Sequence, residues 1–90
     1  MKRIEKSYRG ISERLARRYL SNLGGDIEGG DPEGDGDVIG DEWRASVSSE
    51  KVQIGASVTL TEVTVVFEGE EDALDGLIEK FSQKAMRAGG

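Results

Sequence analysis

The hydrophobic periodicity of this 90-residue chain changes twice, from helical to strand-like and back to helical. In the first segment the apolar residues recur at helical spacing in two neighbouring rows, formed by Ile11, Leu15 and Tyr19 and by Ala16, Leu20 and Leu23. Such a stripe predicts an amphipathic helix over about residues 8 to 23. Gly24 and Gly25 follow it and favour the left-handed conformation at which helices end.

The middle of the chain has the period-two pattern of half-buried strands. Trp43, Ala45 and Val47 alternate with polar residues, which predicts a strand. A second strand contains Val52 and Ile54 and ends at a turn at Gly55. In residues 57 to 68 the facing of the apolar residues changes, from Val58 and Leu60 to Val63, Val65 and Phe67. We interpret this segment as one long strand with a bulge near Thr61 and Glu62.

The last segment, residues 70 to 87, again has helical spacing, carried by Leu74, Leu77, Ile78, Phe81 and Ala85. Acidic residues lie in its first turn and basic residues near its end, which complements the helix dipole. The order predicts an α+β domain of two layers: a helix, three or four antiparallel strands and a helix, with both helices on one face of the sheet. The predicted core places Val47, Val52, Ile54, Val65 and Phe67 under Leu15, Leu20, Leu77 and Phe81.

We expect a single domain over residues 1–90, with a flexible basic N-terminus at residues 1–7 and an acidic, glycine-rich loop at residues 26–41. The net charge of −6 and the acid-rich, lysine-poor composition are typical of proteins that stay soluble in concentrated salt, so we expect a halophilic source. The sequence contains no run of roughly 20 apolar residues and no signal-peptide pattern, which predicts a cytoplasmic location.

The sequence contains neither cysteine nor histidine. The absence of cysteine excludes disulfides, thiolate catalysis and cysteine zinc sites. The absence of histidine removes the commonest general base and metal ligand. Since there is also no nucleophile elbow and no phosphate-binding loop, the sequence favours a non-enzymatic protein without a cofactor.

The acidic loop contains a pattern similar to a calcium-binding loop. Asp31, Glu33, Asp35 and Asp37 stand at ligand positions one, three, five and seven, and Glu42 stands at position twelve. Such a loop normally connects two helices, whereas here a glycine-rich segment precedes it and a strand follows. A solvated acidic loop is therefore the simpler interpretation, and we predict no metal site.

The N-terminal part of the chain is basic, with seven basic and two acidic residues in positions 1–18. The candidate phosphate contacts are Lys2, Arg3, Lys6, Arg9, Arg14, Arg17 and Arg18. Clustered positive charge suits nucleic-acid binding. However, Glu5 and Glu13 interrupt the cluster, and a basic helix face is more often simply solvated.

Two glycines, Gly89 and Gly90, close the sequence. A pair without side chains can enter the narrow channel of an activating enzyme, as the tails of ubiquitin-like and sulfur-carrier proteins do. The alternative is a helix C-cap at Gly89 with a frayed residue beyond it.

The segments "LARRYLSNLGGDIEG", "KVQIGASVTLTEVTVVFEGEEDAL" and "AMRAGG" together resemble the C-terminal domain of MoaD-related proteins. In that family this domain follows a β-grasp sulfur-carrier domain, and its fold is similar to the curved sheet of TATA-binding-protein-like domains. From this resemblance we expect the domain to stand alone, with the acidic segment from Asp31 to Asp41 as an addition to the family pattern.

The resemblance implies a protein associated with a sulfur-carrier or ubiquitin-like modifier system, with Gly89 and Gly90 as a conjugation or docking tail. Its partner would be an activating enzyme or a β-grasp carrier. One alternative is a protein-binding accessory module that uses its sheet face or its first helix. Nucleic-acid binding through the basic N-terminus is the less favoured alternative, and no membrane association is expected.

Overall fold

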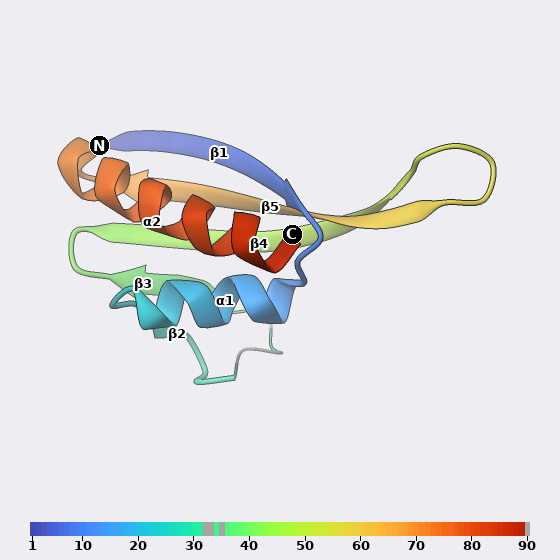
Figure 1. Ribbon diagram of the computed structural model, residues 1–90. Helices are drawn as coiled ribbons and strands as arrows, with labels where there is room; N and C mark the ends of the chain where they lie inside the picture. The colour runs from blue at the N-terminus through green and yellow to red at the C-terminus, as the bar shows by residue number, and fades with distance from the viewer. Residues whose placement is uncertain (32–33, 35, 90) are drawn as a thin grey trace.

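A five-stranded antiparallel sheet carries both helices on one face, which confirms the predicted α+β class (Figure 1). The sheet has more than the three or four strands predicted, and the first element is a strand and not a helix. The computed structural model of the protein describes residues 1–31, 34 and 36–89. Its elements are β1 (Lys2–Arg9), α1 (Glu13–Asn22), β2 (Asp26–Ile27), β3 (Val38–Gly40), β4 (Trp43–Gln53), β5 (Thr59–Gly69) and α2 (Glu71–Gly89). The strand order is β1-β5-β4-β3-β2. The curvature expected from TATA-binding-protein-like domains stays a prediction.

The N-terminus forms a strand, so the expectation of a flexible segment at residues 1–7 is wrong. β1 pairs with β5 in an unbroken antiparallel register from Lys2 to Arg9. Only Ile4 and Tyr8 of this strand pack against the core, and their spacing of four resembles the start of a helix. The helix itself begins later, because the Ser12 side chain caps it by accepting a hydrogen bond from the Leu15 amide at 3.1 Å.

β4 and β5 form a long hairpin without the predicted bulge. Their pairing is continuous from Trp43 opposite Gly69 to Gln53 opposite Thr59. The change of parity between Leu60 and Val63 has another cause: the hairpin runs beyond the two helices, so its far end has no core to face (Figure 1). We call residues 50–62 the arm.

Most of the predicted core is confirmed, but the arm residues assigned to it are not part of it. The confirmed buried side chains are Val47, Val65, Phe67, Leu20, Leu77 and Phe81. Leu15 packs against this cluster and is partly buried. Val52 is only half-buried, and Ile54 is 40% exposed, because no helix covers the arm.

Phe81 joins the two layers at the centre of the core. Its ring contacts Tyr8, Phe67 and Tyr19 edge to face, with centroid distances of 5.0, 5.8 and 6.1 Å. These three aromatic rings come from β1, β5 and α1, so one α2 side chain connects most of the fold.

The segment predicted as the acidic loop, residues 26–41, begins and ends in short strands. β2 pairs with β3 through Asp26 opposite Ile39 and Ile27 opposite Val38. Val38 is fully buried, which anchors this edge of the sheet. No helix in the described part of the chain is long and apolar enough to cross a membrane.

Candidate functional site

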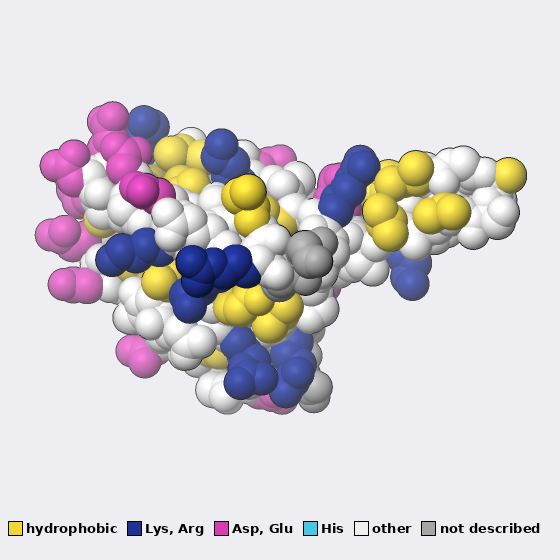
Figure 2. All heavy atoms as spheres, viewed as in Figure 1, with side chains coloured by type: hydrophobic (Ala, Val, Ile, Leu, Met, Phe, Trp, Pro, Cys, Tyr) yellow, Lys and Arg dark blue, Asp and Glu magenta, His cyan; other side chains and the backbone are white. Residues whose placement is uncertain are grey.

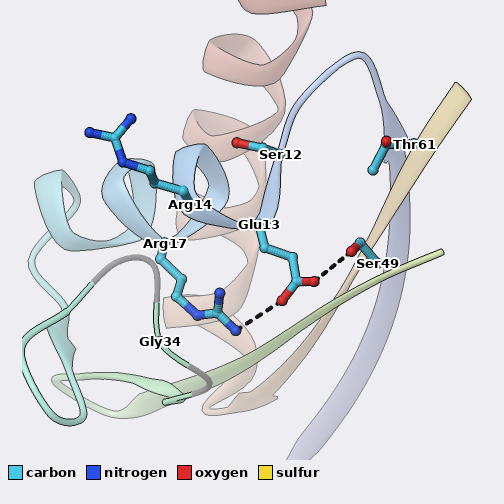
Figure 3. A pocket seen from close by; sticks show the side chains of 7 residues that line it. All are labelled: Ser12, Glu13, Arg14, Arg17, Gly34, Ser49 and Thr61. Carbon is cyan, nitrogen blue, oxygen red and sulfur yellow. Dashed lines mark hydrogen bonds and ion pairs between the residues drawn. The ribbon is translucent and has the colours of Figure 1, made fainter. Parts of the chain in front are cut away.

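A cavity of about 480 Å³ lies where the first turn of α1 meets β4 and β5 (Figure 3). It is lined by Ser12, Glu13, Arg14, Arg17, Gly34, Ser49 and Thr61. The cavity brings together two basic residues, a carboxylate and three hydroxyl side chains, so its hydrogen bonding decides whether these groups are available to a ligand.

Arg17 is 2% exposed and is committed to internal contacts. Its Nε donates to the Gly36 carbonyl at 3.0 Å, and one terminal nitrogen donates to the Val47 carbonyl and to Glu13 Oε1, both at 3.2 Å. The guanidinium therefore connects α1 to the acidic segment and to β4. The prediction that Arg17 contacts nucleic acid is therefore wrong, because a buried and paired guanidinium does not reach a phosphate.

The carboxylate of Glu13 is engaged at both oxygens. Oε1 accepts from Arg17, and Oε2 accepts from the Ser49 hydroxyl at 2.5 Å (Figure 3). With its partners fixed in this way, Glu13 joins the start of α1 to β4. The chain Arg17–Glu13–Ser49 is therefore a structural connection between the two layers.

The predicted basic cluster is divided between the two faces of the sheet. Alternation along β1 places Lys2 and Lys6 on the side of the helices, and Arg3 and Arg9 on the opposite side. Lys2 pairs with Glu71 at 3.3 Å, and Arg9 pairs with Glu62 at 3.1 Å.

Arg14 and Arg18 are exposed on α1. On the face seen in Figure 2, the Lys and Arg side chains lie in several separate groups. The structure thus brings the seven predicted basic residues onto no common surface.

One of the predicted calcium ligands, Asp37, is paired with an arginine. Glu33 and Asp35 lie outside the described residues. Asp37 Oδ2 accepts two hydrogen bonds from Arg44, at 2.6 and 3.0 Å, and this contact raises the pKa of Arg44. The Arg44 guanidinium also pairs with Glu28 at 3.1 Å.

Asp31 and Glu42 complete the predicted calcium set. Asp31 is exposed and closes a turn with Gly34. Glu42 lies beyond β3, in the turn to β4, at a φ of 65°. Within the described residues no group of three or more Asp or Glu side chains is positioned to hold a metal ion.

The predicted tail begins as part of a helix. α2 continues to Gly89, and Gly90 lies outside the described residues. Ala85 is the last side chain of α2 that is buried among those described, whereas Met86 is 75% exposed and Arg87 is exposed. The side chains of Met86 and Arg87 are thus outside the core.

The arm carries a surface feature that the sequence interpretation missed. Ile54, Val58 and Leu60 are 40, 53 and 38% exposed. They account for half of the large exposed hydrophobic residues among those described, and yellow side chains gather along the arm in Figure 2. The parity change between Leu60 and Val63 was the signal, since a strand that extends beyond its core no longer needs one apolar face directed inward.

Comparison with known proteins agrees with the resemblance seen in the sequence. A family model described as archaeal MoaD-like protein matches residues 4–90. No curated protein matches the chain. The matched region includes both helices and nearly all of the sheet. The chain belongs to the archaeal MoaD-like protein family.

Proposed function

We propose that this domain is a non-enzymatic component of a sulfur-carrier or ubiquitin-like modifier system, and that Gly89 and Gly90 serve it as a conjugation or docking element. The observation that supports the proposal is the match of residues 4–90 to the archaeal MoaD-like protein family. The partner in this role is an activating enzyme or a β-grasp carrier protein.

In this proposal the charged groups of the cavity at the start of α1 serve the fold and have no catalytic role. Its carboxylate and its buried guanidinium are both held by neighbouring groups, through Ser49, Val47 and Gly36. Both Glu13 oxygens accept hydrogen bonds from within the protein, which holds the carboxylate in place as a link between α1 and β4.

The end of α2 supports a role for the tail because it can unwind at little cost. The last four carbonyls of a helix lack helical partners, and glycine in a helix costs about 1 kcal/mol relative to alanine. Since Met86 and Arg87 are exposed, unwinding beyond Ala85 removes neither side chain from the core. An extended tail of five residues, 86–90, would then be available to an enzyme channel, while the helical form would serve docking.

The test uses the protein in its native cells with an N-terminal tag, followed by affinity capture and mass spectrometry. Intact mass shows whether Gly90 carries the terminal carboxylate. Digestion then reveals any lysine on another protein that carries this tail, or a thiocarboxylate on the protein itself. We expect such adducts for the wild-type sequence.

Two variants make the result specific. Deletion of Gly89 and Gly90 should abolish the adducts and leave the unfolding midpoint nearly unchanged. Gly90→Ala keeps the length of the chain and should also reduce adduct formation, because the added methyl group narrows the fit to an enzyme channel. The wild-type protein could instead show no adduct and no thiocarboxylate and still capture an activating enzyme in a way that depends on Gly89 and Gly90. That result would assign docking, and not conjugation, to the tail.

A protein-binding accessory module is the second candidate. For such a module, the arm is a better binding surface than the open face of the sheet between β1 and β5, because polar side chains on that face pair with one another. Ser7 contacts Thr64 at 3.2 Å, and Arg9 contacts Glu62 at 3.1 Å. The exposed aliphatic residues of the arm are the observation that favours this candidate.

A further inference from the structure

One edge of the arm has free backbone groups. Within the described residues, β3 pairs with β4 only from Trp43 to Ala45, so β4 has no strand neighbour on that side from Ser46 to Gln53. The Val47 carbonyl points to this side, because it accepts a hydrogen bond from Arg17. In an antiparallel strand every second residue directs its amide and carbonyl to the same side.

The free donors and acceptors can therefore be assigned. Ser49, Lys51 and Gln53 direct their backbone groups outward, as Val47 does. The intervening residues bond to β5, in agreement with the hydrogen bond from the Ile54 amide to the Val58 carbonyl at 2.7 Å. Ser49, Lys51 and Gln53 are also exposed, as pairing with a sixth strand requires.

The side chains beside this edge define what such a strand must offer. Val52 lies directly opposite Leu60, and both lie on the face of the sheet away from the helices. Ile54 and Val58 continue this apolar strip toward the tip of the arm. An added strand would cover the strip if it placed apolar side chains next to Val52 and Ile54.

The negative charge of Glu50, at the end of the apolar strip nearest the core, favours a basic residue at the facing position of the added strand. Glu50 lies directly opposite Glu62 on β5, and Glu62 is already paired with Arg9 at 3.1 Å. Glu50 is exposed beside its like-charged neighbour. A basic side chain on the added strand, directly opposite Glu50, would compensate this charge.

A second copy of the chain fits this edge poorly. When two β4 edges pair about Lys51, the two Lys51 side chains lie opposite each other, and Glu50 lies opposite Val52 of the second copy. When they pair one step closer to Ser49, Glu50 lies opposite Glu50. A stable dimer needs about 800 Å² per partner, and the arm offers only a few partly exposed aliphatic side chains.

We propose that the β4 edge from Ser49 to Gln53 binds an extended segment of another protein by antiparallel strand addition. From its N-terminus to its C-terminus, the segment carries an apolar, an apolar and a basic residue at every second position. The two apolar residues face Ile54 and Val52, and the basic residue faces Glu50. Backbone hydrogen bonds to Ser49, Lys51 and Gln53 supply the affinity, and the three facing side chains supply the specificity. The proposal does not depend on the role of the tail.

The test uses a synthetic nine-residue peptide of threonines, with Val, Val and Lys at the three facing positions. A matched peptide has Glu in place of Lys. We expect saturable amide shifts and slowed hydrogen exchange at Ser49, Lys51 and Gln53 with the Lys peptide. We expect the Glu peptide to bind about three- to tenfold more weakly, because it places like charges opposite each other.

Two proline variants test the edge itself. Lys51→Pro removes an outward amide from β4 and should weaken binding at least tenfold. Its cross-strand partner is Thr61, so Thr61→Pro makes the same change on the β5 edge of the same pair and should leave binding intact. Glu50→Lys, which leaves the backbone unchanged, should reverse the preference of the two peptides.

Several results would overturn the proposal. If Thr61→Pro abolished binding and Lys51→Pro did not, the segment would bind at the β5 edge, and the proposed β4 edge would be wrong. A Glu50→Lys variant with unchanged preference would remove the charge argument. Arm amides protected without peptide, together with a dimer in sedimentation experiments, would make a second copy the occupant.

Discussion

The phenolic hydroxyl of Tyr8 lies 3.0 Å from the Oγ of Ser82, which joins the first strand of the protein to its last helix. The ring of Tyr8 also packs edge to face on Phe81, with 5.0 Å between centroids. These two contacts hold β1 against α2 and explain why the N-terminal strand is an integral part of the fold. They also make the stability of the protein depend on the ionisation of one tyrosine.

We predict that stability declines in alkaline solution through Tyr8. Burial raises the pKa of Tyr8 above its usual value of 10.0, although the hydrogen bond with Ser82 acts in the opposite direction. The unfolded chain therefore ionises first. The contribution of Tyr8 is complete below about pH 10 and is lost as the pH rises through the folded-state pKa.

Tyr8→Phe isolates this contribution. At neutral pH the variant should be less stable by about 1 kcal/mol, because the hydrogen bond to Ser82 is lost. Above about pH 10 the difference from wild type should narrow, as measured by urea unfolding at several pH values. Ser82→Ala is the control, because it removes the hydrogen bond and keeps the buried phenol. A constant difference at all pH values would contradict the prediction.

We predict that Phe81→Ala is among the most damaging single substitutions. Phe81 is fully buried, and truncation of a buried Phe costs about 3–5 kcal/mol. In a domain of this size such a loss is comparable to the whole free energy of unfolding. Urea or thermal unfolding measures it. Met86→Ala on the same helix, where the side chain is 75% exposed, should change stability by no more than about 0.5 kcal/mol.

We predict that Arg17→Ala destabilises the protein by about 3 kcal/mol or more. The substitution leaves the Val47 carbonyl without its guanidinium partner and removes the pair with Glu13. Arg18→Ala, on the exposed side of the same helix, is the matched control and should be nearly neutral. A double-mutant cycle with Glu13→Gln should give a coupling energy of about 0.5–3 kcal/mol. Equal stability of Arg17→Ala and Arg18→Ala would contradict the structural role.

The elements that could be predicted from the sequence are those whose apolar residues recur at a regular spacing and pack against the core along their whole length. The stripes of both helices and the alternation at Trp43, Ala45 and Val47 are examples, although the first helix begins at Glu13 and not near residue 8. β1 was missed because only Ile4 and Tyr8 of its eight residues face the core. The bulge was predicted wrongly because parity alone does not reveal where a strand extends beyond its helices.

The role of Arg17 was inaccessible to sequence reasoning for a different reason. Its burial depends on the carbonyls of Gly36 and Val47, which come from segments 19 and 30 residues away. Backbone carbonyls carry no sequence signal, so an arginine that binds them resembles its solvated neighbours Arg14 and Arg18. The pairing of Asp37 with Arg44 likewise became visible only when the register of β3 and β4 was known.

We predict that the acidic segment gives no saturable response to micromolar calcium. Among the described residues no group of three or more Asp or Glu side chains is positioned to hold a cation, and Asp37 Oδ2 already accepts hydrogen bonds from two Arg44 nitrogens, at 2.6 and 3.0 Å. Amide shifts of Gly36, Asp37 and Glu42 during a calcium titration measure the response. A sodium chloride titration at matched ionic strength corrects for screening of the acidic charges.

Arg44→Ala sharpens the calcium test because it frees the Asp37 carboxylate. If the guanidinium is what prevents binding, this variant gains calcium affinity and the wild type does not. If the positions of the carboxylates prevent binding, neither protein responds, which is the result we expect because Glu42 lies beyond β3 from Asp37. Saturable shifts in the wild type at micromolar calcium, absent with sodium, would establish a site and make our prediction wrong.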